Sequence, residues 1–255
     1  MLFREIAYGP IHSRRLGTSL GVELMPLDHK LCTFNCVYCE CGWNEPVNHP
    51  KLPTREEVKA ALEAKLQALS SQQSDLDVIT FSGNGEPTLH PDFLGIIEDT
   101  CALRNRYYPK AKVSVLSNST QSGRPDVVQA LRLCDNRILK LDAGTDTMMR
   151  RIDLPVNERL TVAQIMEWLK VFDGDFTLQT CFLRGEHAGE RIDNTTPDEL
   201  EAWYKAVEIL RPKQIMIYVI DRKTPEEQLE KISREEMERI AAPLIAKGFD
   251  VSVSA

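Results

Sequence analysis

The chain has 255 residues, of which 42% are hydrophobic and 27% are charged, and its formal net charge is −7. This composition is ordinary for a globular protein, no apolar run is long enough to cross a bilayer, and the negative charge argues against a large nucleic-acid footprint. The seven cysteines are an odd number with several in one loop, which favours a reducing cytoplasm over a disulfide framework.

Residues 1–18 are expected to be a loop-rich extension, because glycine and proline interrupt them before a first strand at 19–24. The adjacent Arg14 and Arg15 would suit an anion on a substrate, such as a phosphate or a carboxylate. A salt bridge that holds the N-terminus is an equal alternative on sequence alone. The first ten residues lack the apolar core of a signal peptide, so we expect a cytoplasmic protein.

Three cysteines follow the first strand within eight residues, as Cys32-Thr-Phe-Asn-Cys36-Val-Tyr-Cys39. Thiolates this close converge on one point, and soft ligands in that arrangement suit a metal cluster. Structural zinc sites and electron-carrying clusters use four protein ligands, whereas three ligands would leave one iron of a four-iron cluster open. A zinc loop with Cys41 or a histidine as fourth ligand stays open, although we favour Cys41 as a loop residue beside the cluster.

The rest of the chain alternates between strands and helices. Period-two and β-branched runs predict strands at 76–81, 112–116, 137–141, 176–183, 214–220 and 250–254. Helices are expected at 54–69, 90–105, 124–133, 145–151, 161–172, from 196 onward and at 233–247, with capping boxes after Thr54, Thr196, Thr224 and Ser233. This pattern predicts a parallel sheet with helices outside, and six strand–helix units fit a partial (β/α)6 barrel. No linker divides the chain, so we expect one domain over 1–255, with the extension at 1–18 and the barrel at 19–255.

Polar residues stand at the ends of the predicted strands, where barrel enzymes bind their ligands. Ser82-Gly-Asn-Gly-Glu86 offers a carboxylate and two glycines that would let the backbone approach a ligand. Ser117 and Asn118 follow the next strand, where they are also default turn residues. Further candidates come from later strands or the loops after them, and these are Lys140, Asp142, Gln179, Cys181 and Arg222.

The cysteine spacing, with the aromatic Tyr38 before the third cysteine, resembles the signature of the radical SAM superfamily. Ser82–Thr88 resembles the G-G-E-P type motif of that family, with Asn84 in place of the first glycine. The motifs G-P-x-x-S-R-R-x-G, D-N-T and Y-x-x-D-R-x-x-P resemble a poorly characterised subgroup, grouped broadly with the radical SAM enzymes of wyosine tRNA modification. The resemblance covers essentially the whole chain, but no flavodoxin-like domain or basic RNA-binding extension accompanies it.

This resemblance implies a partial barrel that binds a 4Fe–4S cluster and S-adenosylmethionine (SAM). Cys32, Cys36 and Cys39 would hold the cluster, and the free iron would bind the amino and carboxylate groups of SAM. One electron would cleave SAM to methionine and a 5′-deoxyadenosyl radical, which abstracts hydrogen from a substrate. The residues implied to contact SAM are Tyr38, Asn84, Gly85, Glu86, Ser117, Asn118, Asp142 and Gln179.

The partners are less defined than the cofactors. The implied chemistry needs an electron donor such as flavodoxin or ferredoxin, and we expect no membrane partner. Arg14, Arg15 and Arg222 are the candidates for substrate contact, and the substrate, an RNA or a small molecule, stays open. An iron–sulfur electron carrier or sensor that never cleaves SAM is the rival interpretation. Cys181 would be a hydrogen-atom donor or, as is usual for a buried strand cysteine, a small hydrophobe.

Overall fold

The computed structural model describes residues 2–13 and 16–255, so Arg14 and Arg15 lie outside the described residues. The chain folds as two compact units. The N-terminal unit comprises residues 1–32, 44–117 and 121–137, and the C-terminal unit comprises residues 33–43, 118–120 and 138–255. The cysteine loop is therefore divided, with Cys32 in the first unit and Cys36 and Cys39 in the second. The expectation of a single domain stays a prediction.

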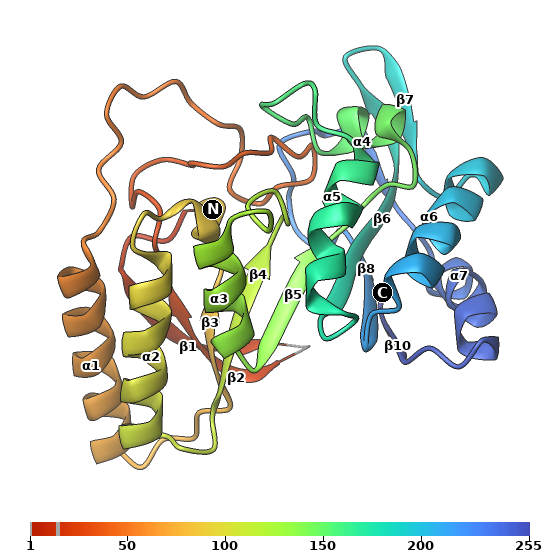
Figure 1. The fold of residues 1–255 in the computed structure, drawn as a ribbon. Coiled ribbons are helices and arrows are strands. Elements are labelled where there is room, and N and C mark those ends of the chain that lie inside the picture. The colour runs from red at the N-terminus through yellow and green to blue at the C-terminus, as the bar shows by residue number, and fades with distance from the viewer. Residues whose placement is uncertain (1, 14–15) are drawn as a thin grey trace. The chain divides into compact units, whose positions relative to one another are not determined.

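The N-terminal unit is a four-stranded sheet with three helices on one side of it (Figure 1). Its strands lie in the order β1 (Ala7–Ser13), β2 (Gly17–Val22), β3 (Val78–Phe81) and β4 (Lys112–Ser117). Strands β2, β3 and β4 are parallel, as predicted, and β1 is antiparallel to β2. The helices are α1 (Arg55–Ser71), α2 (Phe93–Tyr107) and α3 (Pro125–Leu133), with a short 3₁₀ turn at Pro87–Leu89.

The strand β1 corrects the expectation that residues 1–18 form a loop. Ala7 pairs with Val22 and Ser13 with Gly17, with an irregularity between Tyr8 and Ile11. That irregularity falls on the Gly-Pro pair, which breaks the alternation that would have indicated a strand. Residues 7–13 of the extension are thus part of the sheet.

Helix α1 shows how local sequence fixes an element of this unit. The Thr54 hydroxyl accepts from the backbone N–H of Glu57, and the Glu57 carboxylate accepts from the backbone N–H of Thr54 at 2.7 Å. This confirms the predicted capping box, which satisfies two amide groups at the helix start. The residues at helical spacing are buried, as predicted, and these are Val58, Leu62, Leu66 and Leu69.

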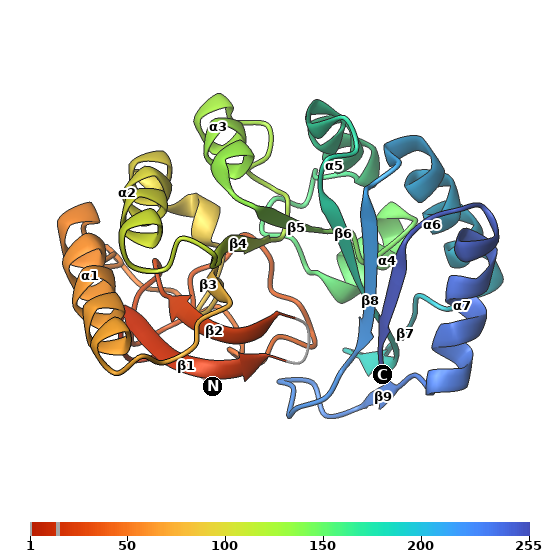
Figure 2. The same ribbon diagram turned by 90° about the horizontal axis from the view of Figure 1, so that it is seen from below.

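The C-terminal unit repeats the same plan, with helices outside a parallel sheet (Figure 2). Four parallel strands are neighbours in this sheet, in the order β5 (Asn136–Lys140), β6 (Thr177–His187), β8 (Gln214–Val219) and β10 (Val251–Ser254). Only the last three residues of β5 belong to this unit. Its helices are α4 (Asp146–Ile152), α5 (Val162–Leu169, continued by a 3₁₀ turn at Lys170–Phe172), α6 (Pro197–Leu210) and α7 (Arg234–Ala246). The rings of Phe182 and Trp203 pack edge to face in its core.

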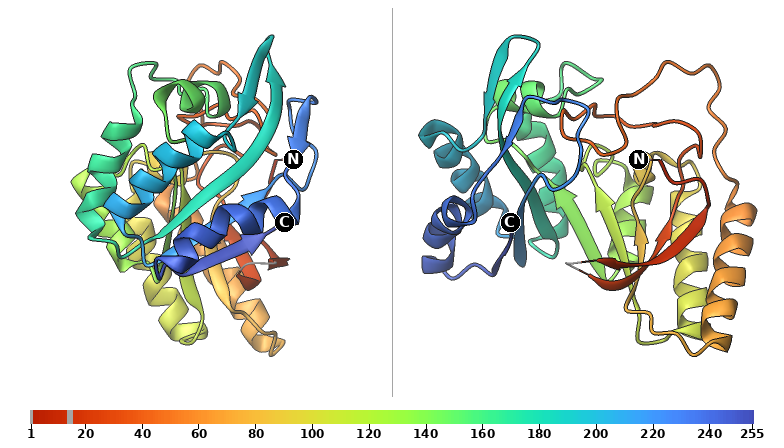
Figure 3. Two further views of the ribbon diagram at one scale, coloured as in Figure 1. Left: turned by 90° about the vertical axis from the view of Figure 1, so that its right-hand side faces the viewer. Right: turned by 180° about the vertical axis from the view of Figure 1, so that it is seen from behind.

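Strand β6 runs past the parallel sheet, and this corrects the loop expected at 184–194. Its last residues pair antiparallel with β7 (Glu190–Asp193) on one side and β9 (Leu229–Lys231) on the other. The two strands of the β6–β7 hairpin project beyond α6 (Figure 3). Ala188 and Gly189 both have positive φ, as a two-residue hairpin turn requires, and Ala-Gly is a weaker signal for this turn than Asn-Gly.

Two predicted capping boxes are wrong. Thr196 makes no side-chain cap to α6, because the Glu199 carboxylate instead accepts from the Thr145 hydroxyl and, at 3.1 Å, from the Gly144 backbone. Thr224 starts no helix, since its hydroxyl donates to the Glu226 carbonyl in a loop before β9. The box at Ser233 is confirmed in part, because its hydroxyl accepts from the backbone N–H of Glu236.

No helix in residues 2–13 and 16–255 is both long and apolar enough to cross a membrane.

Candidate functional site

The start of the cysteine loop is fixed by the motif that follows β3. Leu31, the residue before Cys32, pairs with Gly85 through two backbone hydrogen bonds, from Leu31 to Asn84 at 3.0 Å and from Glu86 to Leu31 at 3.1 Å. A Cβ added at Gly85 would lie 1.7 Å from the Leu31 carbonyl oxygen. The glycine that sequence analysis assigned to close approach of a ligand thus allows close approach of the chain that carries Cys32.

Replacement of Gly85 by alanine is therefore expected to destabilise the protein by about 2 kcal/mol or more, because a backbone atom must move to make room. Gly189→Ala is the matched control. Gly189, unlike Gly85, has a positive φ, but nothing lies within 4 Å of its added Cβ, so only backbone strain of about 1 kcal/mol is expected. Denaturant unfolding of the two variants measures the difference, and equal losses would contradict this role for Gly85.

The polar side chains of this motif are buried and already hydrogen-bonded within the N-terminal unit. The Asn84 amide donates to the carbonyls of Phe3 and Pro26 and accepts from the Phe3 N–H, so it ties the N-terminal segment to the motif. The Glu86 carboxylate accepts from the Ser117 hydroxyl at 2.8 Å and from the Thr88 backbone at 3.1 Å. Glu86 and Ser117, predicted from separate strands, are thus brought together.

Glu23 is a buried carboxylate beside this motif that sequence analysis missed. It accepts from the backbone N–H of Met25 at 2.8 Å and of Asn84 at 2.7 Å. Burial raises the pKa of Glu23 to about 7, and the backbone N–H groups only partly offset this. A glutamate inside the first predicted strand was the available signal, because charged side chains are rarely buried without partners.

The raised pKa of Glu23 predicts a pH dependence of stability. The folded state binds the proton more tightly than the unfolded state, so the stabilisation is complete below pH 4.5 and is lost as the pH rises through 7. At about 1.4 kcal/mol per pKa unit, the loss is about 3 kcal/mol. Chemical unfolding across this range should show the decline, and Glu23→Gln should flatten that part of the profile. A wild-type and a variant profile of the same slope would contradict the prediction.

The cysteine loop continues in the C-terminal unit, where backbone hydrogen bonds join it to the turn after α4. Asn35 donates to the Asp153 carbonyl at 2.8 Å, Val37 donates to the Ile152 carbonyl at 2.9 Å, and Val156 donates back to Thr33 at 2.9 Å. The Cys39 N–H bonds the Cys36 carbonyl at 3.1 Å, so these two cysteines share one turn.

A second clamp on this loop comes from the turn after β4. The Asn118 amide donates to the Thr33 hydroxyl at 2.8 Å, and the Thr33 and Thr120 hydroxyls lie 2.7 Å apart. Ser119, with φ of 71°, donates its hydroxyl to the Lys140 carbonyl at 2.9 Å. Asn118, predicted to contact SAM, is thus placed against the cysteine loop.

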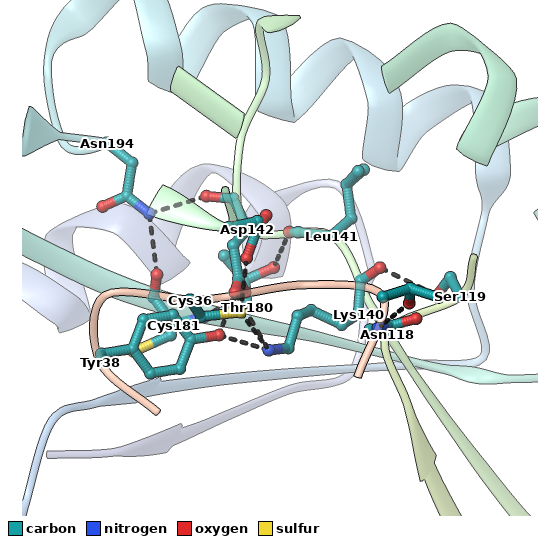
Figure 4. A network of polar contacts seen from close by, with 12 residues as sticks. Cys36, Tyr38, Asn118, Ser119, Lys140, Leu141, Asp142, Thr180, Cys181 and Asn194 are labelled. Atoms are coloured by element: carbon teal, nitrogen blue, oxygen red, sulfur yellow. Dashed lines mark hydrogen bonds and ion pairs between the residues drawn. The ribbon is translucent and has the colours of Figure 1, made fainter. Parts of the chain in front are cut away.

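A buried polar network surrounds Cys36 (Figure 4). The Cys36 thiol donates to Asp153 at 3.3 Å, and the Lys140 ammonium lies 3.8 Å from the Cys36 sulfur. Lys140 also donates to the Tyr38 hydroxyl at 2.5 Å, and Tyr38 in turn donates to the Asp142 carboxylate. Lys140, the last residue of β5, and Asp142, two residues further along the chain, therefore both reach the cysteine loop, with Nζ and Oδ2 3.6 Å apart.

Burial and mutual charge set the electrostatics of this network. Burial and the Asp142 carboxylate raise the pKa of Tyr38 and of Asp153 above their ordinary values. Burial alone would lower the pKa of Lys140, but the electrostatic influence of the acidic groups Cys36 and Asp142 outweighs burial and raises the pKa. The lysine is therefore an ammonium group.

The neighbouring strand β6 adds the remaining predicted residues of this face. The Cys181 backbone donates to the Asp142 carboxylate at 2.8 Å, and burial raises the pKa of the Cys181 thiol well above its ordinary value. The buried Gln179 amide donates to the Met216 sulfur at 3.7 Å, a weak acceptor. Asn194 of the D-N-T motif donates to the carbonyls of Asp142 and Cys181, both at 2.8 Å, and so joins the two strands.

Arg222 lies apart from this network. Its guanidinium donates to Glu40 at 2.6 Å, and both side chains are largely exposed. Cys41 follows directly and is half-buried. The predicted substrate contact of Arg222 stays a prediction.

The chemistry of the donor set fits an iron–sulfur cluster. Cys32, Cys36 and Cys39 form no disulfide in the described part of the chain, and both parts of the loop that carries them are fixed by backbone hydrogen bonds. Thiolates are the ligands such clusters take, and a nearby ammonium suits their negative charge. Asp153 was not among the predicted residues, because an aspartate after a short helix looks like an ordinary C-terminal turn residue.

Comparisons with known proteins agree with this donor set. A model of the radical SAM superfamily matches residues 29–193, more than half of the chain. A UPF0026 protein of Helicobacter pylori is 31% identical over 182 residues, which are 71% of this chain and 57% of that protein. A protein of Brachyspira hyodysenteriae named GTPase Obg is 29% identical over 235 residues, 91% of this chain and 32% of that protein. The chain therefore spans only a third to somewhat over half of these relatives.

Solved structures share the fold. A radical SAM methyltransferase from Sphaerobacter thermophilus matches with a TM-score of 0.66 at 15% identity, over 92% of this chain and 65% of that chain. A structure of TYW1 with a lysine-pyruvate adduct bound matches with a TM-score of 0.61 at 15% identity, over 91% of this chain and 75% of that chain. These matches confirm the predicted α/β fold of the partial-barrel type.

Proposed function

The chain belongs to the radical SAM superfamily, whose members use a 4Fe–4S cluster and SAM, and we propose that Cys32, Cys36 and Cys39 hold that cluster here. The observation that carries the proposal is the three-cysteine loop, which lies inside the matched region and is held by its backbone. Three protein ligands leave one iron for SAM. The cluster and SAM, when bound, supply a 5′-deoxyadenosyl radical for hydrogen abstraction from a substrate.

The residues around the loop serve this chemistry by binding, orienting and excluding water. Glu86, beside Ser117, is proposed to accept the amino group of SAM, with Asn84 and Gly85 holding the backbone that presents it. Asn118 keeps Thr33, and with it the loop, in place. On β5 and β6, Asp142 and Gln179 are proposed to contact the ribose, carboxylate or adenosine of SAM. The buried aromatic Tyr38 closes the loop against Asp142 and keeps water from the cluster.

The reductant and the substrate belong to the same proposal. A low-potential carrier such as flavodoxin or ferredoxin would supply the electron. The substrate is an RNA or a small molecule, with Arg14, Arg15 and Arg222 as candidate contacts. The net charge of −7 and the ion pair of Arg222 with Glu40 give no support to an extensive RNA-binding surface.

The test is SAM cleavage by the anaerobically reconstituted protein. With dithionite and SAM, we expect slow formation of 5′-deoxyadenosine and methionine in equal amounts. Cys41→Ser should form the product at the wild-type rate, whereas the triple Cys→Ser variant at 32, 36 and 39 should form none. A protein that holds a reducible cluster but leaves SAM intact would instead be the electron carrier or sensor.

A further inference from the structure

The Lys140 side chain is directed at the sulfur of a proposed cluster ligand. Its ammonium nitrogen lies 3.8 Å from Cys36 Sγ, at the limit of a hydrogen bond to sulfur, and its side chain is only 16% exposed. Lys140 stands at the end of β5, and Cys36 lies in the cysteine loop of the same unit. Figure 4 shows the Lys140 ammonium directed at the Tyr38 hydroxyl and at the Cys36 sulfur.

The position of the ammonium is fixed by two neighbours. The Tyr38 hydroxyl accepts from Lys140 at 2.5 Å while it donates to Asp142, and the Asp142 carboxylate lies 3.6 Å from the ammonium. The Lys140 ammonium also lies 4.8 Å from the centre of the Tyr38 ring, within the range of a cation–π contact. Because the ammonium group is already held at several points, its surroundings need little reorganisation when the charge of the cluster changes.

A fixed cation at this place has a definite electrochemical effect. The reduction potential of an iron–sulfur cluster depends on net charge, on hydrogen bonds to the sulfurs and on burial. Reduction adds one negative charge to a cluster that thiolates already make negative. A buried ammonium stabilises the reduced form more than the oxidised form, and the low surrounding dielectric strengthens the effect.

We propose that Lys140 is a positioning residue that donates a charge-assisted hydrogen bond to the Cys36 sulfur and thereby makes the cluster easier to reduce. This inference rests on the proposed function, because it takes Cys36 as a cluster ligand. It also gives the buried Tyr38–Asp142 pair a purpose, which is to hold the ammonium against the sulfur. Loss of Lys140 would remove the cation and leave the Asp142 carboxylate without it, and both changes disfavour reduction.

The test is the midpoint potential of the reconstituted cluster, measured by redox titration without SAM. Lys140→Met removes the charge but keeps an unbranched side chain, and Lys140→Arg keeps the charge. Lys170→Met, which removes a surface lysine paired with Glu167, is the matched control. We expect the Met variant to be at least tenfold harder to reduce, a fall of about 59 mV for one electron. The Arg variant should retain most of the wild-type potential, and the control should retain all of it.

An unchanged midpoint in a Met variant with full iron and sulfide content would overturn the proposal. So would a Met variant whose only defect is weaker SAM binding, since Lys140 would then serve SAM. If the Met variant holds no cluster, the Arg variant decides. A cluster at the wild-type potential in the Arg variant supports the role of the charge. A lost cluster, or a midpoint that falls by about 59 mV or more in the Arg variant, refutes it. Wild-type protein that binds the cluster but forms no 5′-deoxyadenosine would refute the proposed enzyme and leave the Lys140 result interpretable.

Discussion

Serine at Cys36 is expected to abolish cluster binding and with it all formation of 5′-deoxyadenosine. The Cys36 sulfur is buried and lies between Asp153 and Lys140, and no other cysteine is among these contacts. A serine hydroxyl is a hard, weakly acidic ligand, which iron–sulfur clusters accept poorly. Cys32→Ser and Cys39→Ser should have the same result, because three ligands are the fewest that hold a cluster with one open iron. Iron and sulfide analysis after anaerobic reconstitution measures how much cluster each variant binds.

Cys41→Ser is the matched control, since it lies in the same loop and carries the same chemical change. We expect full iron content and an unchanged visible spectrum. Loss of iron on Cys41→Ser alone, or full iron in the Cys36 variant, would contradict the assignment of the ligands.

Glu86→Ala is expected to keep the cluster and to weaken SAM binding roughly tenfold to a hundredfold. A charge-assisted hydrogen bond between an ammonium group and a buried carboxylate contributes about 1.5–3 kcal/mol, which corresponds to that range. Equilibrium binding of SAM to the reconstituted, oxidised protein gives the dissociation constant.

The control separates this role from a structural one, because Glu86 also caps the turn at Pro87–Leu89. Glu86→Gln keeps the shape of the side chain and can still accept from Thr88 or Ser117, but it carries no charge. We expect it to fold normally and still to bind SAM weakly. Wild-type affinity in the Gln variant would show that the charge does not bind SAM.

Local rules in the sequence predicted most of the architecture, and the exceptions have physical causes. Thr54 and Ser233 cap helices as their spacing indicates. The cap predicted with Glu199 does not form, because its carboxylate accepts hydrogen bonds from Gly144 and Thr145, a tertiary contact that local spacing cannot reveal. The strand β1 was hidden by its Gly-Pro pair, and the β6–β7 hairpin by a turn without a strong signature.

Some residues of the candidate site could likewise be predicted from the local sequence, and others could not. Lys140 and Asp142 were both predicted as candidates from their place at the end of a strand, and both contact Tyr38. Asp153 and Glu23 depend on which turns and strands the fold brings together, so no local pattern identified their partners. The sequence predicted that Gly85 allows the backbone to approach a ligand closely, whereas in the structure Gly85 allows close approach of the Leu31 backbone.

The proposed function requires that three cysteines would hold the cluster and leave one iron open for SAM. Electron paramagnetic resonance of the reduced cluster, with SAM that carries an isotopically labelled amino nitrogen, tests this most directly. We predict that SAM changes the spectrum and that hyperfine coupling to the labelled nitrogen appears, with both effects absent for Cys36→Ser. A reduced cluster whose spectrum is the same with and without SAM would contradict the account.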